Sequence, residues 1–476
     1  MKERILVQGT VSEVAFPSKG RVVPTPEQPP LPEADFLGGI CYRAPSEAQG
    51  PFYVKNVLPG QTILASLGMK GKRSREGHLL SVTAPAAYET PALCPHASVC
   101  GGCRYQTVPY ALQLQWKEQQ VRRLLQDIPG MAEANWTPIC PSPLPFEYRN
   151  KMEFSFGDTY KGGPLTLGLH KQGAFHDIVD TADCRLVHSD MRHILQTSGE
   201  YFRTAGASYY NTHTHEGWLR HLVLRRSFST GEILINLVTS SQDALPLEPW
   251  VKQLTQLPLD GSVAGILHTL NDTLGDVVQK DALHLLYGRD TLTESLLGLC
   301  FVISPFSFFQ TNSLGAAKLY DIVRRMAGDV SRQRIFDLYC GTGTIAQVLA
   351  AAGAAEVAGI ELVAEAAEAA RINAEANGLT NCAFLAGDVL RLTESLPGQP
   401  DLIVLDPPRD GCHPKALPKI LSFGPRCFIY VSCKPTSLAR DLPAFIEAGY
   451  RVTDVQCCDM FPMTPGVETV VRLERN

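Results

Sequence analysis

The sequence predicts an α/β protein with a doubly wound, Rossmann-like parallel sheet at its C-terminal end, after an OB-like β-barrel and a central α+β domain. Three observations predict this class. Strand-like and helical segments alternate from about residue 315 onward, and acidic residues end successive strands of that region. Short apolar runs between Gly and Pro fill residues 4 to 88. Because 476 residues exceed one ordinary core, we expect three domains, at residues 1–88, 89–300 and 301–476.

The composition is that of a soluble globular protein, with 45% hydrophobic and 19% charged residues. The chain has no apolar run of about 18 residues and no signal-peptide pattern at its start, so we expect a cytoplasmic protein that does not span a membrane. Its 14 cysteines are then expected to be thiols, metal ligands or nucleophiles. The net charge of −5 argues against non-specific coating of nucleic acid but leaves local basic patches open, such as residues 69–75 and Arg220.

The barrel is predicted from runs such as "RILVQGTVSEV", "PFYVKNVLPG" and "HLLSVTAP", interrupted by a Pro-rich loop from Pro24 to Asp35. Barrels of this kind often bind single-stranded nucleic acid. Residues 110–126 have the apolar spacing of an amphipathic helix, which we expect to pack on the C-terminal domain despite its position. The runs "LRHLVLRR" and "EILINLVTS" predict strands of the central domain.

A glycine-containing turn, "DLYCGTG", follows the first strand of the C-terminal domain. Its glycines would let the backbone approach a ligand closely. Acidic residues end the first three strands, and the pyrophosphate fingerprint G-x-G-x-x-G is absent. This combination favours a cationic ligand without phosphates, such as S-adenosylmethionine. The predicted site consists of Asp337, Gly341, Gly343, Glu361 and Asp388.

Three further strand-end residues suggest chemistry. Asp406 begins the "DPP" turn after the fourth strand, where its carboxylate would lie beside the cofactor. Cys433 follows the buried run "FIYVS", at the edge of the sheet where open α/β folds bind ligands. Glu468 follows a Pro-rich loop near the C-terminus. Cys433 and Glu468 together suggest a nucleophile and a base contributed by two loops.

A cysteine-dense segment, "LCPHASVCGGC", contains Cys94, Cys100 and Cys103, and Cys184 is a plausible fourth ligand. Four thiolates suit either zinc or an iron–sulfur cluster. The spacing C-x5-C-x2-C differs from the C-x3-C-x2-C that radical chemistry requires. We therefore expect a structural or RNA-contacting role for this metal site.

Six blocks resemble, in the same order, the signature blocks of the RNA uracil-5-methyltransferases: "CPHASVCGGC", "SPFSFFQTN", "DLYCGTGTIA", "DPPRDG", "YVSCKPTSLARDL" and "DMFPMTPGVE". The barrel resembles the RNA-binding TRAM domain found in the ribosomal-RNA branch of that family. The resemblance covers nearly the whole chain. It implies S-adenosylmethionine as cofactor and a [4Fe–4S] cluster held by Cys94, Cys100, Cys103 and Cys184.

The resemblance also assigns roles. It makes Cys433 the thiolate that adds to C6 of uracil and Glu468 the base that removes the C5 proton. The target base must leave any stack to reach the thiol. Arg149 matches a residue that lines the active site near the RNA, and Arg220 is a weaker candidate for RNA contact. The cofactor contacts implied are Gln310, Tyr339, Glu361, Asp388 and Asp406, the last alternatively binding the uracil edge.

Two positions depart from the family pattern. Gly466 replaces a common His two residues before the base, so proton removal could be slower. Lys434 replaces the usual Asn after the nucleophile, where a cation is expected to lower the thiol pKa or to meet a phosphate.

Several functions remain open at this point. The expected partner is RNA, with 23S ribosomal RNA favoured and transfer RNA possible, and the chain is expected to be a monomer. An RNA cytosine-5-methyltransferase usually has a Cys after the Pro of the D-x-P turn, where this chain has "DPPR". A non-catalytic RNA-binding module would not need Cys433 and Glu468. A nicotinamide-dependent oxidoreductase lacks support because the third glycine is missing.

Overall fold

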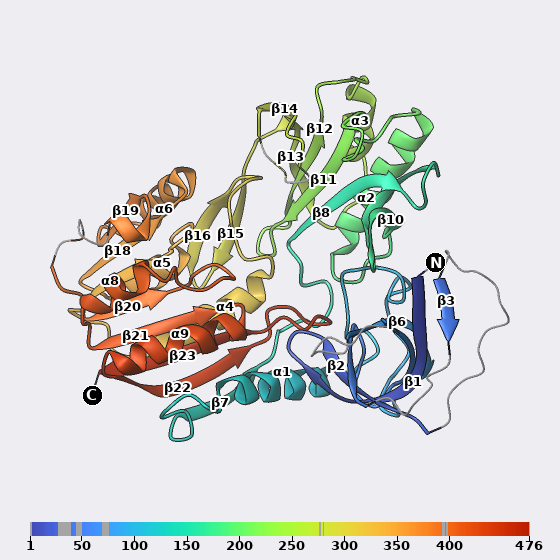
Figure 1. Cartoon of the computed structure of the whole chain (residues 1–476). Coiled ribbons are helices and arrows are strands. Elements are labelled where there is room, and N and C mark those ends of the chain that lie inside the picture. The colour runs from blue at the N-terminus through green and yellow to red at the C-terminus, as the bar shows by residue number, and fades with distance from the viewer. Residues whose placement is uncertain are drawn as a thin grey trace. The chain divides into compact units, whose positions relative to one another are not determined.

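The computed structural model describes residues 2–26, 40–43, 50–68, 76–275, 278, 280–392, 396 and 398–475. The basic run at 69–75 and most of the Pro-rich loop predicted at 24–35 lie outside these residues. The chain forms two compact units, and the order of their elements is followed in Figure 1. The first unit comprises Met1–Ala92, Arg104–Trp116 and Met463–Pro465, and the second comprises Leu93–Cys103, Lys117–Pro462 and Gly466–Asn476.

The first unit contains a closed barrel. Its strands are β1 (Lys2–Ala15), β2 (Lys19–Pro24), β4 (Phe52–Lys55), β5 (Thr62–Gly68) and β6 (Glu76–Ala84), with β3 (Ile40–Arg43) added beside β1. The described strands close in the order β1-β2-β4-β6-β5 and back to β1, which is consistent with an OB-like domain. The closure depends on β1, which pairs with both β5 and β2 along its length. Alternate residues of the strands, such as Val22, Phe52 and Ile63, fill the interior.

The second unit contains a central sheet, in the order β10-β9-β8-β11-β12-β13-β14. Its strands are β8 (Lys151–Asp158), β9 (Leu165–Lys171), β10 (Ala174–Asp180), β11 (Leu219–Arg226), β12 (Glu232–Thr239), β13 (Ser262–Leu270) and β14 (Ala282–Gly288). The two strands predicted from "LRHLVLRR" and "EILINLVTS" are confirmed as β11 and β12. Helices α2 (Ser189–Thr204) and α3 (Glu248–Thr255) pack on one face through aromatic residues such as Phe156, Phe202 and Trp250.

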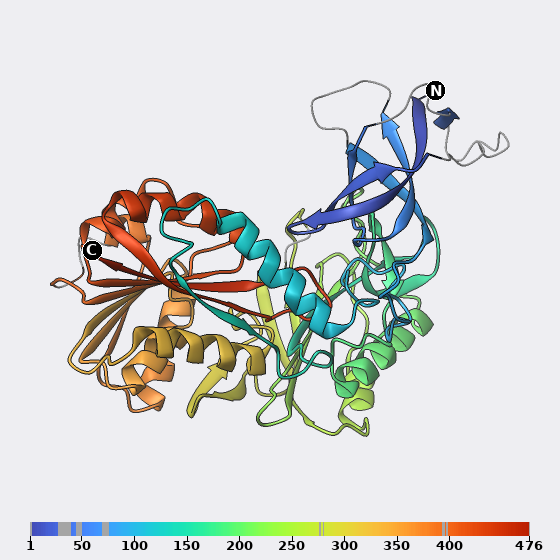
Figure 2. The ribbon, with the colours of Figure 1, turned by 90° about the horizontal axis from the view of Figure 1, so that it is seen from below.

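The same unit contains the doubly wound sheet that the sequence predicts. Its strands are β17 (Arg334–Leu338), β18 (Glu356–Glu361), β19 (Cys382–Ala386), β20 (Leu402–Leu405), β21 (Cys427–Ser432), β22 (Tyr450–Cys458) and β23 (Glu468–Arg475). The order is β19-β18-β17-β20-β21-β23-β22, and β23 alone of these runs antiparallel to its neighbours. The strands are continuous apolar runs because helices cover both faces. Figure 2 shows α4 on one face and α9 on the other.

The helices of this region are α4 (Ser313–Ala327), α5 (Thr344–Ala351), α6 (Ala364–Ala376), α7 (Val389–Leu392), α8 (Ala416–Ser422) and α9 (Pro435–Glu447). A hairpin of β15 (Leu292–Leu296) and β16 (Leu299–Ile303) precedes α4, and its apolar side chains join the same core. Within the described part of the chain, no helix has the length and apolar character needed to cross a bilayer.

The C-terminal sheet recruits a strand from outside the predicted domain. β7 (Asn135–Cys140) pairs in parallel with β22 at the edge of the sheet, so residues assigned to the central domain complete this sheet. Helix α1 (Tyr110–Leu125) contributes Lys117, whose Nζ lies 2.6 Å from Asp459 Oδ1, just after β22. The expectation that this helix packs on the C-terminal domain is confirmed for its second half. The predicted boundary at residue 300 therefore does not separate the elements of the second unit.

Candidate active site

Three of the predicted residues lie on adjoining strand ends of the C-terminal sheet. Asp406 directly follows β20, Cys433 directly follows β21, and Glu468 is the first residue of β23. β20 and β21 are parallel neighbours, whereas β21 and β23 are antiparallel and pair Ser432 with Thr469. The carboxyl ends of β20 and β21 therefore meet the start of β23 at one edge. The antiparallel direction of β23 is what brings Glu468 to this edge.

These groups influence one another's ionisation. Glu468 is only 3% exposed, and burial, helped by the neighbouring Asp406 carboxylate, raises its pKa to about 8. Burial likewise raises the pKa of Asp406 to about 7. The pKa of the Cys433 thiol is raised to about 11 by burial and by the charges of Glu468 and Asp406. The Glu468 carboxyl and the Cys433 thiol therefore favour their protonated forms near neutral pH, whereas Asp406 is close to half ionised.

One cation opposes this trend. Arg409, three residues after Asp406, lowers the pKa of both Cys433 and Glu468. Its backbone carbonyl accepts a hydrogen bond of 2.6 Å from Ser437 Oγ, at the start of α9, which ties the "DPPRDG" loop to the helix that follows Cys433. Lys434, predicted to lower the thiol pKa or to meet a phosphate, places its Nζ 3.8 Å from Asp410 Oδ1.

The glycine turn after β17 has the backbone geometry of a close-approach loop. Gly341 and Gly343 have φ values of 56° and 70°, a region that residues with a Cβ rarely adopt. A Cβ at Gly343 would lie 2.5 Å from the Phe384 ring. The Gly341 amide donates to Glu361 Oε2 at 2.9 Å, so this carboxylate spans the turn and the end of β18.

Asp337 is fully buried beneath this turn. Its Oδ2 accepts a hydrogen bond from the Ala346 amide at 2.9 Å, whereas its Oδ1 has no hydrogen-bond partner among the described residues. Burial and the nearby Asp406 raise its pKa to about 8. An unpaired, buried carboxyl oxygen is costly unless a ligand meets it. With Glu361 close by, this position fits a cationic group.

The remaining predicted cofactor residues surround the same edge. Asp388 is exposed two residues after β19, with Oδ1 accepting from the Leu390 amide. Tyr339 adopts a left-handed φ of 69° within the turn. Gln310 precedes α4, and its carbonyl accepts from Asn150 Nδ2 at 2.8 Å.

Sequence reasoning missed two residues of this site, Tyr320 and Arg409. The buried hydroxyl of Tyr320, on α4, forms a hydrogen bond with the Gln310 side chain. Burial, together with the charges of Asp406, Glu468 and Asp337, raises the pKa of this hydroxyl. Its position on the apolar face of α4 gives no local signal. Arg409, by contrast, stands in the recognisable "DPPRDG" block.

The predicted RNA-facing arginines differ in environment. Arg149 is partly exposed, and its backbone bridges to the segment at Val187. Arg220 is 3% exposed and donates to the carbonyls of Asn271, Thr273 and Gly275. Both Nη atoms therefore donate to backbone carbonyls of the same unit, and this buried position argues against the predicted surface contact of Arg220 with RNA.

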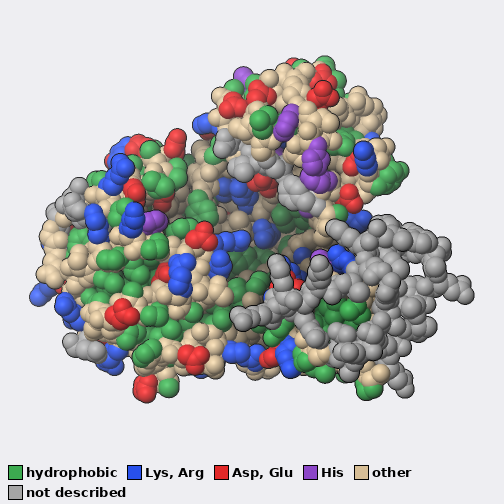
Figure 3. Space-filling view, viewed as in Figure 1, with side chains coloured by type: hydrophobic (Ala, Val, Ile, Leu, Met, Phe, Trp, Pro, Cys, Tyr) green, Lys and Arg blue, Asp and Glu red, His purple; other side chains and the backbone are tan. Residues whose placement is uncertain are grey.

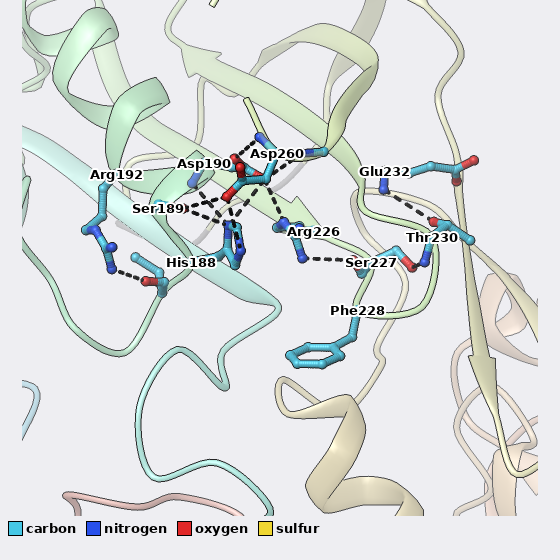
Figure 4. A network of polar contacts seen from close by, with 12 residues as sticks. His188, Ser189, Asp190, Arg192, Arg226, Ser227, Phe228, Thr230, Glu232 and Asp260 are labelled. Carbon is cyan, nitrogen blue, oxygen red and sulfur yellow. Dashed lines mark hydrogen bonds and ion pairs between the residues drawn. The ribbon is translucent and has the colours of Figure 1, made fainter. Parts of the chain in front are cut away.

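The neighbouring Arg226 is also structural. Its Nε donates to Asp190 at 2.8 Å, and Figure 4 shows this pair beside His188 and Asp260. The group His188, Asp190 and Asp260 has the spacing of a metal site. However, Asp190 also accepts the backbone amides of Asp260 and Gly261, so Arg226 and these amides already satisfy it.

The four predicted cluster cysteines lie in the second unit and form no disulfide. Gly101, within their loop, donates its amide to the His170 carbonyl at 2.9 Å and so fixes the loop on the central domain. Cys94 and Cys100 lie near enough to Cys184 to add to the effect of burial, which raises the pKa of that thiol to about 11. Thiols crowded in this way need a cation to become thiolates together.

Comparison with known proteins agrees with this geometry. A protein-family profile described as "Methyltransferase domain" matches residues 329–440, which include the glycine turn and Asp406. The chain is 46% identical to an uncharacterized RNA methyltransferase from Clostridium tetani, over 89% of this chain and 92% of that protein. It is 44% identical to an uncharacterized RNA methyltransferase from Caldanaerobacter subterraneus subsp. tengcongensis, over 94% of this chain and 98% of that protein.

A solved structure extends the likeness to the whole chain. It is the tRNA (uracil-54, C5)-methyltransferase of Pyrococcus abyssi in complex with S-adenosyl-L-homocysteine. The two proteins are 25% identical and superpose with a TM-score of 0.73, over 98% of this chain and 100% of the other.

Proposed function

The chain belongs to the S-adenosylmethionine-dependent RNA methyltransferases, and we propose that it methylates C5 of a specific uridine. One observation carries the proposal. A thiol, Cys433, and a buried carboxyl, Glu468, occupy adjoining strand ends close enough for the charge of one to shift the pKa of the other. A methyl transfer to a good nucleophile would need neither group. A transfer to C5 of uracil needs both.

The chemistry follows from the weakness of C5 as a nucleophile. The Cys433 thiolate adds to C6, which turns the ring into an enolate with carbanion character at C5. S-adenosylmethionine supplies the methyl group that C5 takes, from its sulfonium sulfur. Glu468 then accepts the proton of C5, the Cys433–C6 bond breaks, and the 5,6 double bond returns. Arg409 favours the thiolate form of Cys433 that adds to C6 and the carboxylate form of Glu468 that accepts the C5 proton.

The acidic pocket around the glycine turn supports S-adenosylmethionine as the ligand. A cationic ligand would meet the unpaired Asp337 Oδ1 and offset the burial and neighbouring charge that raise the pKa of Asp337, as well as the burial that raises the pKa of Asp406. We propose that Glu361 and Asp388 bind the ribose and the base of the cofactor, with Gln310, Tyr339, Gly341 and Gly343 completing the contacts. Asp406 is assigned to the methyl end or to the uracil edge.

We assign a [4Fe–4S] cluster to Cys94, Cys100, Cys103 and Cys184. Zinc sites usually combine two pairs of ligands with C-x2-C-like spacing, whereas Cys184 has no second cysteine near it in the sequence, so the four thiolates fit the cluster better than zinc.

The proposed substrate is 23S ribosomal RNA, bound in part by the N-terminal barrel acting as a TRAM domain. Transfer RNA is the second candidate, because a transfer-RNA enzyme is similar over almost the whole chain. Because that similarity includes the barrel, the presence of a barrel favours neither RNA over the other. Both RNAs are therefore offered in the experiment below.

The decisive experiment uses RNA that contains 5-fluorouridine, S-adenosylmethionine and the purified protein, analysed on a denaturing gel. Fluorine at C5 cannot leave as a proton, so the covalent intermediate should persist as a slow-migrating adduct. Ribosomal-RNA fragments and transfer RNA are offered separately. We expect an adduct with one of them.

The matched control is Cys433→Ala, which should form no adduct while binding S-adenosylmethionine as before. The buried Cys457→Ala variant should still form the adduct. If the unaltered protein binds cofactor and RNA but forms no adduct with either RNA, the covalent mechanism is wrong.

A further inference from the structure

A cavity of about 410 Å³ lies on the polar face of the central sheet, the face opposite α2 and α3. Figure 3 shows a hollow in this part of the molecule, between the central sheet and the C-terminal sheet, with Lys and Arg side chains in its wall. The cavity is lined by Lys151, Glu153, Val223, Asn236, Val278, Pro305 and Phe306. None of these residues has a role in the proposed reaction.

The hydrogen bonding of Asn236 indicates that the cavity binds a ligand. Its side chain is 2% exposed, and its Oδ1 accepts a hydrogen bond from Thr269 Oγ1 at 2.8 Å. Its amide nitrogen, Nδ2, is buried without a hydrogen-bond partner in the described part of the chain. A buried donor left without a partner destabilises the folded protein. A carbonyl oxygen or ring nitrogen entering the cavity would satisfy it.

The sheet register places a second polar group at a useful distance. Glu153 of β8, Val223 of β11 and Asn236 of β12 are directly opposite one another and therefore share one face. Glu153 and Asn236 stand two strand spacings apart, about 10 Å, with the apolar Val223 between them. That span accommodates one flat base with a hydrogen bond of about 3 Å at each end. Lys151, two residues before Glu153 on the same strand, also lines the cavity.

A stacking surface completes the cavity. Phe306 is 36% exposed, and Lys280 lies over its ring at 5.6 Å from the centroid. The loop that carries Phe306 is fixed to the sheet by the buried Arg225, which donates to the carbonyls of Pro305 and Ser307. The same loop leads to Gln310, so the cavity is joined to the proposed cofactor site by a short stretch of chain.

We propose that this cavity binds a second, unmethylated base of the RNA substrate, stacked on Phe306 and held between Asn236 and Glu153. The Asn236 amide donates to a carbonyl oxygen of the base, and Glu153 accepts from an exocyclic amine. Guanine and cytosine are the bases that carry both groups on one edge. The cavity would then fix which uridine reaches Cys433, and this inference rests on the proposed function.

The test measures RNA affinity by fluorescence anisotropy without cofactor, so that the readout does not depend on catalysis. The probes are the ribosomal-RNA fragments and the transfer RNA described above, each with single abasic sites placed in turn around the candidate uridines. For the unaltered protein, we expect one abasic position to weaken binding about tenfold, as loss of one stacked base does.

Two variants remove different parts of the cavity. Asn236→Asp keeps the acceptor for Thr269 but replaces the donor, and Phe306→Leu removes the ring while keeping an apolar side chain. Each variant should bind the intact RNA about tenfold more weakly than the unaltered protein does. Neither variant should lose further affinity when the RNA is abasic at that position. Thr255→Val, on α3 at the opposite face of the sheet, is the control and should behave as the unaltered protein. Replacing guanosine by inosine, or cytidine by uridine, at that position identifies the base.

Losses that are equal on intact and abasic RNA, or unchanged affinity in both variants, would overturn the proposal. The two hypotheses fail in different ways. If the abasic position weakens binding but no 5-fluorouridine adduct forms, the cavity stands and the proposed reaction falls. If the adduct forms but RNA affinity does not depend on Asn236 and Phe306, the proposed reaction stands and the base-binding cavity falls.

Discussion

The side chains at the strand ends form an acidic site that is built to receive a cation. Asp337, Asp406 and Glu468 all have pKa values raised by burial and, for Asp337 and Glu468, by the charge of Asp406. Their ionisation is costly until positive charge arrives. The sulfonium of S-adenosylmethionine would supply that charge, so cofactor binding should also favour the ionised forms of the Cys433 thiol and the Glu468 carboxyl.

The raised pKa of Glu468 predicts the pH dependence of methyl transfer. A carboxyl with a pKa near 8 is protonated at lower pH and cannot act as a base, so the single-turnover rate should fall as the pH drops below about 8. Glu468→Gln should slow product formation by about 100-fold or more. Quench-flow assays from about pH 6 to about pH 10 measure both effects.

The same variant separates the base from the nucleophile. Because Glu468 raises the thiol pKa, Gln at this position should favour the thiolate, so the Cys433 adduct should form readily and accumulate on ordinary uridine RNA. An unchanged pH profile and no accumulated adduct would show that Glu468 is not the base.

At the level of single elements, α1 and β7 support the segment that connects β22 to Glu468, the proposed base. Lys117 is only 1% exposed, and its ammonium group contacts both Asp459 Oδ1, at 2.6 Å, and the Phe461 carbonyl, at 3.1 Å. These contacts fix the chain where it leaves β22 and turns toward Glu468. The pair is isolated from solvent, so each partner depends on the other.

Lys117→Met should therefore destabilise the protein by about 3–5 kcal/mol, because Asp459 is left buried without its counter-ion. Urea denaturation measures this loss. The surface residue Arg371, which pairs with Glu368 and Glu375, gives the control, since Arg371→Ala should cost at most about 1 kcal/mol. Similar losses for the two variants would contradict the assignment.

At the scale of the whole molecule, the cysteine site joins distant parts of the chain. The loop from Cys94 to Cys103 and the segment at Cys184 meet within the second unit, and the loop is also held by the His170 carbonyl. A cluster bound to all four thiolates would close this long stretch of chain and restrict the unfolded state.

Protein purified without oxygen should contain iron and sulfide in equal amounts, with an iron–sulfur absorption band. Cys184→Ser should lose most of the iron and unfold at a lower temperature. Cys300→Ser, at an exposed cysteine of β16, should keep both properties. Stoichiometric zinc with no sulfide would show that the site is a zinc centre.

Local sequence patterns are enough to predict the doubly wound sheet, the barrel and the acidic residues at the strand ends around the glycine turn. These features follow from local patterns: apolar runs, Gly and Pro at turns, and acidic residues at strand ends. Local patterns also predict that Cys433 and Glu468 lie at strand ends, because a buried strand ends where its run of apolar residues ends.

Which distant segments lie side by side is seen in the tertiary structure and not in the sequence patterns. β7 joins the C-terminal sheet through pairing with β22, and Tyr320 reaches the site from the interior of α4. Arg220 reads as a surface cation in sequence, yet its guanidinium is buried among carbonyls that lie about 50 residues further along the chain. Asn236 likewise has no distinguishing sequence context. Its amide nitrogen is buried without a partner because three strands and the loop at Phe306 surround it. Contacts between such distant segments cannot be predicted from a local sequence pattern.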